Sequence, residues 1–200
     1  MRTSSKTLFG FAAWLLAVGP VVAQQGGSAP QMSPEEQAMM AAMEKAATPG
    51  AEHAWLAAMA GGWDFTASFW MKPGDPPTTS TGRAERSMML GGRVMVEKVT
   101  SEMMGQPFEG FGMMGFDNVG GKYWGTWNDN MTTGVMSSTG TCRNSKCEFQ
   151  STAYDPVTGK LMTARMTSEH AADREVHAMY SAGPDGKEFK TMELVYTRRK

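Results

Sequence analysis

The side chains that most readily bind a metal or a cofactor are scarce in this 200-residue chain. Its histidines are His53, His170 and His177. His53 stands at the start of an expected short helix, where we expect it to be solvated or to cap that helix. Alternation along one strand-like segment places His170 on the same face as Met166, at the inner rim of the fold. A lone imidazole can hold haem or a metal ion, but it is more commonly structural, so we predict no metal site and no cofactor.

The 20 methionines raise the question of copper, because thioethers bind Cu(I) in an oxidising compartment. Adjacent strand residues point to opposite faces, so a pair such as Met88-Met89 cannot hold one ion from one side. Met39 and Met43 could share a helix face, but no cysteine or histidine accompanies them. Soft packing in the core, or the lining of an apolar cavity, explains the same residues. Buffering against oxidation is a third interpretation.

Sequence patterns of common enzymes are missing. The chain contains no G-x-S-x-G, no phosphate-binding loop, no H-E-x-x-H and no C-x-x-C. Asp117 and Asp155 stand in turn-forming segments, which is typical of turn residues rather than of a general acid and base. The sequence therefore favours a non-catalytic protein over an enzyme and leaves the question of activity open.

Aromatic and polar side chains on strand-like segments are candidates for contacting a small molecule. Trp127 shares a face with Asp129, whose carboxylate would need a partner such as Arg93. Tyr180 shares another face with Val176. If both faces point inward, their side chains could line a pocket. The simpler interpretation is that they fill the core. The residues expected to contact a ligand are Arg93, Trp127, Met166, His170 and Tyr180.

The two cysteines are spaced for a structural disulfide. Cys142 and Cys147 flank a turn-forming tetrapeptide, residues 143–146, between two strand-like segments. Opposite positions on a hairpin lie within disulfide range. A redox or metal pair would need further ligands, which the neighbouring sequence lacks. We therefore predict a Cys142–Cys147 bridge, which is typical of an oxidising compartment.

Residues 1–23 have the pattern of a secretory signal peptide. Arg2 and Lys6 give a positive start, residues 8–18 are apolar, and a small-residue cleavage site ends at Ala23. The apolar stretch is too short to span the roughly 30 Å of a bilayer core. We expect cleavage near Ala23, export to the bacterial periplasm or beyond, and no stable membrane anchor.

A linker and a helix follow the expected signal peptide. Residues 24–32 are Gln, Gly, Ala, Ser, Pro and Met, which is typical of a flexible linker. An amphipathic helix is predicted over residues 33–48, because Ser33 and Glu36 have the spacing of a capping box around a proline at the first helical position. A second short helix is expected over residues 51–60.

From residue 63 onward the hydrophobic period changes from helical spacing to two. Nine turns rich in Gly, Pro, Asn and Asp separate ten segments of strand length, with no helical crossover between them. This pattern of turns and strand-length segments predicts that residues 49–200 form a mainly β domain. We expect an antiparallel up-and-down barrel of about ten strands, preceded by one or two short α-helices, because closure removes exposed strand edges.

The overall charge excludes one class of partner. The chain has 19 basic and 20 acidic residues, a formal net charge of -1. This lacks the basic excess that nucleic-acid binding requires, so we expect no nucleic-acid partner. A hydrophobic content of 41% also excludes a disordered chain.

The motif Gly61-Gly62-Trp63, where the short helix joins the first strand, resembles the G-x-W signature of the calycins, which include lipocalins and fatty-acid-binding proteins. In that superfamily the Trp closes one barrel end and a basic residue of the last strand packs across the indole. Arg198 has the alternation needed for this role, as cation–π stacking. The resemblance implies structural roles for Gly61, Trp63 and Arg198.

Longer segments resemble a bacterial family of secreted domains of unknown function. The segments are residues 48–53, 69–70, 90–93, 104–110 and 183–193. This resemblance implies a lipocalin-like β-barrel. It implies no established activity and supplies no catalytic residues.

Together these features favour an exported protein that binds a small apolar or amphipathic molecule inside a β-barrel. This function requires an internal cavity, which we expect to measure several hundred Å³. The alternative is a non-catalytic structural or protein-interaction module that docks through the Met-rich helix at residues 33–48.

Overall fold

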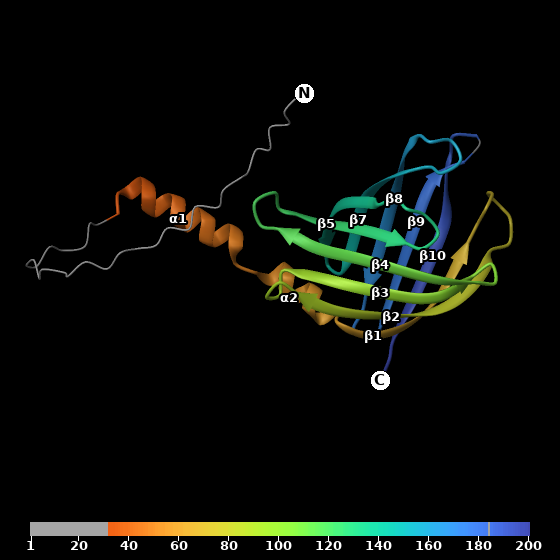
Figure 1. Cartoon of the computed structure of the whole chain (residues 1–200), viewed down its shortest axis with the longest axis horizontal. Coiled ribbons are helices and arrows are strands. Elements are labelled where there is room, and N and C mark those ends of the chain that lie inside the picture. The colour runs from red at the N-terminus through yellow and green to blue at the C-terminus, as the bar shows by residue number, and fades with distance from the viewer. Residues whose placement is uncertain (1–31, 184) are drawn as a thin grey trace, which may run out of the picture.

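The computed structural model describes residues 32–183 and 185–200, so the expected signal peptide and residues 24–31 of the expected linker lie outside the described residues. Helices α1 (Pro34–Ala47) and α2 (Ala51–Ala58) come first (Figure 1). The strands that follow are β1 (Gly61–Phe69), β2 (Thr78–Met89), β3 (Val94–Met103), β4 (Gln106–Asp117), β5 (Lys122–Asp129), β6 (Met136–Arg143), β7 (Lys146–Tyr154), β8 (Leu161–His170), β9 (Arg174–Ala182) and β10 (Glu188–Arg198). Neither described helix has the length and apolar character needed to cross a membrane.

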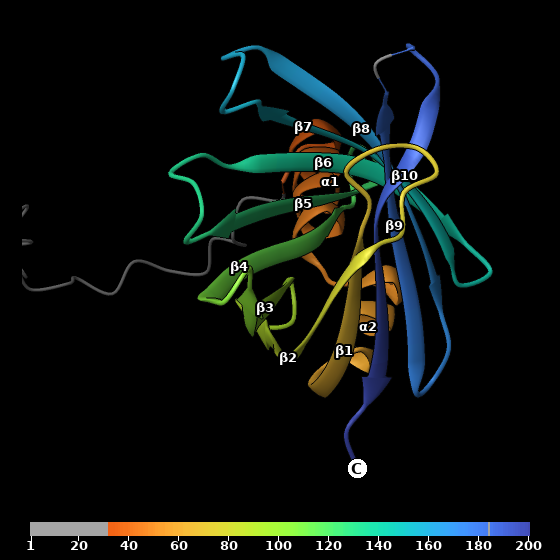
Figure 2. The same ribbon diagram turned by 90° about the vertical axis from the view of Figure 1, so that its right-hand side faces the viewer.

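The strands form a closed antiparallel barrel in which each strand pairs with its neighbours in sequence. The first and last strands close it: Trp63 of β1 lies opposite Arg198 of β10, and Phe69 lies opposite Met192. Figure 2 shows β4, β5 and β6 crossing the direction of β1, β9 and β10, as expected for strongly twisted strands. The predicted ten-strand up-and-down barrel is confirmed.

Pairing between strands determines which side chains enter the barrel, because directly opposed residues lie on the same face of a sheet. Trp63 is opposite Ala84, and Ala84 is opposite Val99, so all three lie on one face of the sheet. Because all three are buried, this is the inner face. Two apolar clusters fill much of the interior. One contains Trp63, Phe65, Ala67, Ala84, Val99 and Tyr196, and the other contains Leu56, Met59, Met95, Tyr123, Cys147 and Phe149.

Helix α2 packs on one end of the barrel through Leu56, which is fully buried. Trp55 contacts Tyr123 and His170 edge-on, with ring centroids 5.4 and 5.0 Å apart. At the start of the helix, the backbone N–H of Gly50 donates to Nδ1 of His53 at 3.1 Å. His53 therefore caps the helix, as expected, but it is buried rather than solvated.

Helix α1 begins with the predicted capping box: Oγ of Ser33 accepts from the N–H of Glu36, and the N–H of Ser33 donates to the Glu36 carboxylate. No residue of α1 is buried, and the helix projects from the barrel in Figure 1. Its methionines Met39, Met40 and Met43 are each more than half exposed. Docking through this helix therefore stays a prediction.

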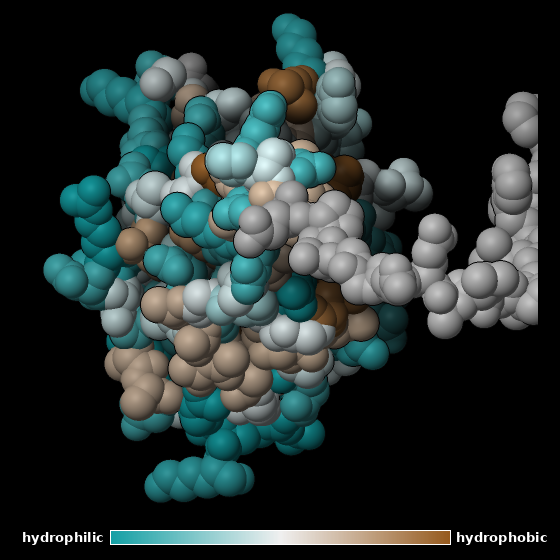
Figure 3. All heavy atoms as spheres, turned by 90° about the vertical axis from the view of Figure 1, so that its left-hand side faces the viewer, coloured by the Kyte–Doolittle hydropathy of each residue, from teal (hydrophilic) through white to brown (hydrophobic). Residues whose placement is uncertain are grey.

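Figure 3 views the molecule from the side on which α1 lies. Hydrophilic and moderately apolar residues are intermixed on this face, and strongly hydrophobic ones form small separate spots. Side chains of the barrel hold the C-terminal end of α1. Nδ2 of Asn118 donates to the carbonyls of Lys45 and Thr48, and Nη2 of Arg93 donates to that of Ala47.

The predicted disulfide joins β6 to β7 beside the turn of their hairpin. The sulfur atoms of Cys142 and Cys147 are 2.05 Å apart and their Cα atoms 4.0 Å apart. Asn144 and Ser145 form the turn with φ angles of 49° and 63°. Two central residues with positive φ are typical of the tight hairpin turn that matches strand twist.

Candidate functional site

A buried ion-pair network lies inside the barrel, centred on Arg86 of β2. Nε of Arg86 donates to Oε1 of Glu97 at 2.7 Å, and Nη1 donates to Oε2 of Glu175, also at 2.7 Å. Glu97 faces Arg86 directly from the neighbouring strand β3, whereas Glu175 reaches it from β9. The side chains of Arg86 and Glu175 are 3% and 1% exposed, so the barrel holds both charges away from solvent.

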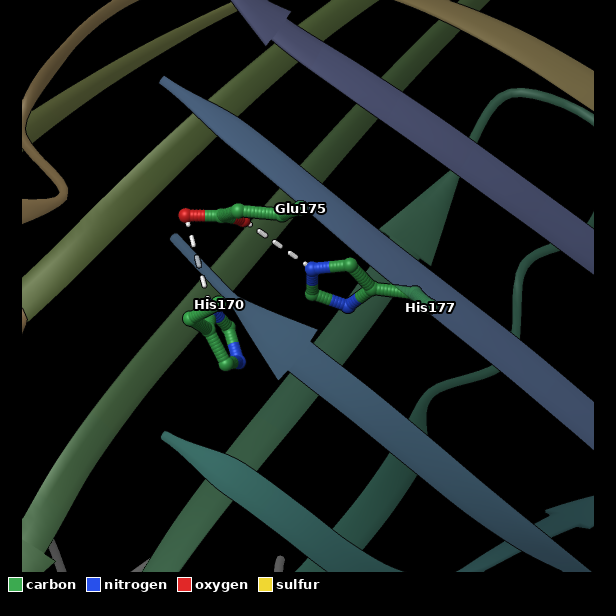
Figure 4. Close-up of side chains that lie close together, drawn as sticks. All are labelled: His170, Glu175 and His177. Atoms are coloured by element: carbon green, nitrogen blue, oxygen red, sulfur yellow. Dashed lines mark hydrogen bonds and ion pairs between the residues drawn. The ribbon is translucent and has the colours of Figure 1, made fainter. Parts of the chain in front are cut away.

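Two histidines flank the Glu175 carboxylate, one at each oxygen (Figure 4). Nε2 of His177 lies 3.0 Å from Oε2, and Nδ1 of His170 lies 3.4 Å from Oε1. The β8–β9 hairpin positions all three residues, because His170 pairs with Glu175 and His177 alternates inward from it. Oγ of Ser168 contacts the other nitrogen of His170, Nε2, at 2.8 Å.

Two atoms of this cluster have no hydrogen-bond partner among the described residues. They are Nδ1 of His170 and Oε1 of Glu175, and both are buried. Their separation of 3.4 Å is long for a hydrogen bond. Since buried polar atoms are nearly always paired, these two indicate a position where a further atom could bind.

The cluster alters the ionisation of its members. Burial alone would raise the pKa of Glu175, but His170, His177 and the charge of Arg86 outweigh it, and this pKa lies far below its ordinary value. Burial lowers the pKa of His177, against the attraction of Glu175. Burial also disfavours the charged form of Arg86, yet Glu97 and Glu175 hold its pKa above the ordinary value. At neutral pH, Arg86 and Glu175 are therefore charged while His177 is neutral.

Aromatic rings surround the Arg86 guanidinium. Its central carbon lies 5.0 Å from the ring centre of Trp63 and 4.7 Å from that of Tyr196. Burial, together with the charge of Glu97, keeps the pKa of the Tyr196 phenol well above its ordinary value. Because the guanidinium is buried, cation–π attraction adds to the ion pairs that hold this arginine.

The G-x-W motif at the start of β1 packs against Arg198 of β10. The guanidinium carbon of Arg198 lies 4.4 Å from the Trp63 ring centre, and Nη1 of Arg198 donates to the carbonyl of Ala60 at 2.8 Å. Gly61 has a φ of 122°, which other residues rarely adopt, and a Cβ there would lie 3.2 Å from Arg198. Trp63 itself donates from Nε1 to the carbonyl of Met59 at 3.0 Å.

A cavity of about 160 Å³ lies beside the ion-pair network. One part of its wall is apolar and the other carries the buried charges. The apolar lining includes Met59, Met95, Met114, Trp127, Met136, Phe149 and Met166, and the polar lining includes Arg86, Glu97, Ser138, Ser168, His170, Glu175 and His177. The expected volume of several hundred Å³ is wrong, because the two apolar clusters occupy much of the interior.

Comparison with known proteins assigns a family to this barrel. Residues 48–198 match the family described as protein of unknown function (DUF1579). The chain belongs to this family. The match begins just before α2 and ends in β10, so it includes the barrel and leaves out α1. The predicted resemblance to a family of unknown function is confirmed.

Among the solved structures similar to this DUF1579 barrel is the crystal structure of Rv2717c from M. tuberculosis. The two share 10% sequence identity with a TM-score of 0.56, and the alignment covers 76% of this chain and 100% of the other. At this identity the likeness shows the fold alone. No curated protein matches the chain.

Three of the five residues expected to contact a ligand line the cavity of the DUF1579 barrel. They are Trp127, Met166 and His170. Asp129 faces inward beside Trp127, as expected, but its partner is not Arg93. Instead, Oδ2 of Asp129 accepts from the indole nitrogen of Trp127 at 3.0 Å.

The other two expected residues, Arg93 and Tyr180, lie away from this cavity. Arg93 follows the β2–β3 turn, where Nη1 donates to the carbonyl of Leu90 and Nη2 to that of Ala47. Tyr180 pairs with Arg165 on the outer face of β8 and β9, and the Arg165 guanidinium stacks on its ring at 4.2 Å. The expectation that the Tyr180 face points inward is wrong, because β9 turns His177 and Glu175 inward instead.

Sequence reasoning missed the charged centre of the site. Arg86, Glu97, Glu175 and His177 all occupy inward positions of their strands. The available signal was a charged residue among apolar ones on the same alternating face of a strand, such as Arg86 between Ala84 and Met88. That signal becomes specific only when strand pairing shows that these faces meet inside one barrel.

Proposed function

We propose that the barrel binds a small amphipathic molecule in the cavity beside Arg86. The observation that carries this proposal is the two-part lining of the cavity, with thioether and aromatic carbon on one side and buried charges on the other. Binding sites for small molecules combine mostly apolar walls with a few placed polar groups. Methionine suits such a wall, because its flexible side chain adapts to irregular ligand shapes.

The size of the cavity limits the ligand. A protein cavity of about 150 Å³ can hold benzene, and this one measures about 160 Å³. Pockets for drug-sized ligands usually measure about 300–1,000 Å³. The volume therefore supports a ligand the size of one ring with a short substituent, rather than a long acyl chain.

The charges on the wall favour one kind of polar group. The positive charge of Arg86 is shared between the carboxylates of Glu97 and Glu175. Two carboxylates therefore face one guanidinium, which leaves one excess negative charge on the wall, and Oε1 of Glu175 is an acceptor without a hydrogen-bond partner among the described residues. A ligand that offers a cationic or hydrogen-bond-donating group, such as a primary amine, complements this wall better than a carboxylate does.

A pair of matched probes tests the proposal. We expect benzylamine to bind chelator-treated protein with saturable heat in calorimetry, and benzoate to bind at least tenfold more weakly, because its carboxylate would face Glu97 and Glu175. Equal affinity for the two probes, or no saturable binding of benzylamine, would contradict the proposal.

Filling the cavity provides a second test on the same protein. Ser138 lines the cavity from β6, opposite Gly125, so leucine at this position should occupy the space of the probe. We expect Ser138→Leu to weaken benzylamine binding at least tenfold. The control is Ser137→Leu, since Ser137 is exposed on the opposite face of the same strand and should leave affinity unchanged. Equal affinity of the two variants would place the probe elsewhere.

We also propose that the protein is exported with cleavage near Ala23. Support comes from the signal-like pattern of residues 1–23 and from the disulfide between Cys142 and Cys147, which suits an oxidising compartment. The protein recovered from the periplasm of a bacterial host should have the intact mass of a chain that begins at Gln24. Ala23→Arg should retain the uncleaved mass, because cleavage sites require small residues. Recovery of the full-length wild-type chain would contradict this proposal.

A further inference from the structure

The cluster of His170, Glu175 and His177 has the composition of a metal site. Each residue offers one donor atom, and the three donor atoms lie within 4.8 Å of one another. We propose that these three side chains bind one divalent transition-metal ion, of the zinc type, on the wall of the cavity. This inference does not depend on the proposed small-molecule ligand.

The spacing of the donors fits a single ion. Ligand atoms about 2.1 Å from a tetrahedral ion lie about 3.4 Å from one another. In the structure, Nδ1 of His170 is 3.4 Å from Oε1 of Glu175, and Nε2 of His177 is 3.0 Å from Oε2. All three donors lie within 4.8 Å of one another, so side-chain rotations that break the His177–Glu175 hydrogen bond would direct them at one point. Figure 4 shows both imidazole rings next to the carboxylate.

The unpaired atoms supply an independent observation. Nδ1 of His170 and Oε1 of Glu175 are buried and have no hydrogen-bond partner among the described residues. The side chains that carry them are 7% and 1% exposed. An ion coordinated by both atoms would compensate for the water that each has lost on burial.

Neighbouring side chains form hydrogen bonds that orient the donors, as the hydrogen-bond partners of metal ligands do in metalloproteins. Oγ of Ser168 lies 2.8 Å from Nε2 of His170. In the tautomer with the proton on Nε2, that N–H donates a hydrogen bond to Oγ of Ser168, and the lone pair of Nδ1 is free for a metal. Arg86 holds Oε2 of Glu175 at 2.7 Å, which fixes the carboxylate and leaves Oε1 available.

The donor set selects the class of ion. Two imidazoles and one carboxylate suit zinc and related first-row ions, whereas magnesium and calcium prefer oxygen ligands alone. Both cysteines, Cys142 and Cys147, are joined in a disulfide, so neither offers a thiolate for Cu(I). Arg86 neutralises one of the two carboxylates beside it, and the remaining negative charge favours a cation. Three protein donors also leave a coordination position for a water molecule.

Cobalt and zinc titrations test the proposal on untagged protein freed of metal with a chelator. We expect one equivalent of Co²⁺ to produce visible absorption bands, one equivalent of Zn²⁺ to abolish them, and native mass spectrometry to show one bound zinc. His170→Gln and His177→Gln should each weaken Co²⁺ binding at least 100-fold. Ser168→Ala keeps all three donors and should weaken it about tenfold, because loss of an outer partner typically costs 10–100-fold in affinity.

Two controls separate a specific site from general effects. His53→Gln alters the remaining histidine of the chain, and Glu169→Gln alters an exposed carboxylate that pairs with Lys146. Both should bind cobalt as the wild type does. Absence of the visible bands in the wild type, or unchanged affinity in a folded His177→Gln protein, would overturn the proposal. Since no benzylamine is present, the result is independent of the probe experiments.

Discussion

Replacing Arg86 by methionine is expected to lower the free energy of unfolding by about 3–5 kcal/mol, measured by urea denaturation in the presence of a chelator. The physical reason is that Glu97 and Glu175 would be left as carboxylates inside the barrel without their positive partner. Removing one member of a buried ion pair typically costs this much, because the remaining charge is neither paired nor solvated.

The matched control is Arg83→Met on the same strand. Arg83 pairs with Asp64 at 3.5 Å, and both side chains are more than half exposed, so this change should have little effect. Adding Glu175→Gln to Arg86→Met should recover part of the lost stability, because it removes the stranded charge. If the Arg83 and Arg86 variants unfold at the same urea concentration, the buried network contributes little to the free energy of unfolding.

Trp63→Ala should lower the free energy of unfolding by a comparable amount, about 3–5 kcal/mol. Trp63 is completely buried, and its indole N–H donates to the carbonyl of Met59. Its ring contacts the guanidinium groups of Arg86 and Arg198. The substitution removes the ring that these groups contact and leaves a cavity in the aromatic cluster. Denaturant unfolding monitored by far-ultraviolet circular dichroism measures the effect.

Two further variants make the Trp63 result interpretable. Trp63→Phe retains a ring but loses the hydrogen bond to Met59, so it should lose less than half as much stability as Trp63→Ala. Trp124→Ala removes an indole from the outer face of β5, where the side chain is only half-buried. The expected role of Trp63 is wrong if the Trp124 and Trp63 alanine variants unfold at the same urea concentration.

The architecture could be predicted from sequence because its signals are local. Alternation along residues 63–71 and turn residues between the strands are enough to indicate antiparallel strands, and the capping box at Ser33 indicates the start of α1. The disulfide follows from a hairpin register that involves only six residues. Each of these features depends on neighbours in the chain, whose geometry the sequence constrains directly.

The candidate site could not be predicted in the same way, because its members meet across the barrel. Arg86 and Glu175 are separated by 89 positions, and their contact depends on closure and on the register of every strand pair between them. Sequence alone placed His170 at the inner rim, where it lies, but not beside His177 and Glu175. The partner of a buried charge can be identified only when the pairing of all the strands is known.

The error at Tyr180 has a specific physical cause. Along β9, Val176, Ala178 and Tyr180 form the more apolar face, and hydrophobicity alone predicts that this face is inside. The structure turns the opposite face inward, with Glu175 and His177. Arg86 and the imidazoles stabilise the buried carboxylate of Glu175. On this strand the paired polar face therefore points inward although the other face is more hydrophobic.

Closure between β1 and β10 has a consequence for how the chain folds. The hydrogen bond from Arg198 to the carbonyl of Ala60 spans 138 positions, and the β1–β10 ladder joins segments that are almost as far apart in the sequence. Topologies dominated by such long-range contacts fold slowly, and β1 keeps an unpaired edge until β10 has been synthesised. The barrel therefore cannot close during most of translation, which would keep the chain in a form that can still be threaded across a membrane if it is exported as proposed.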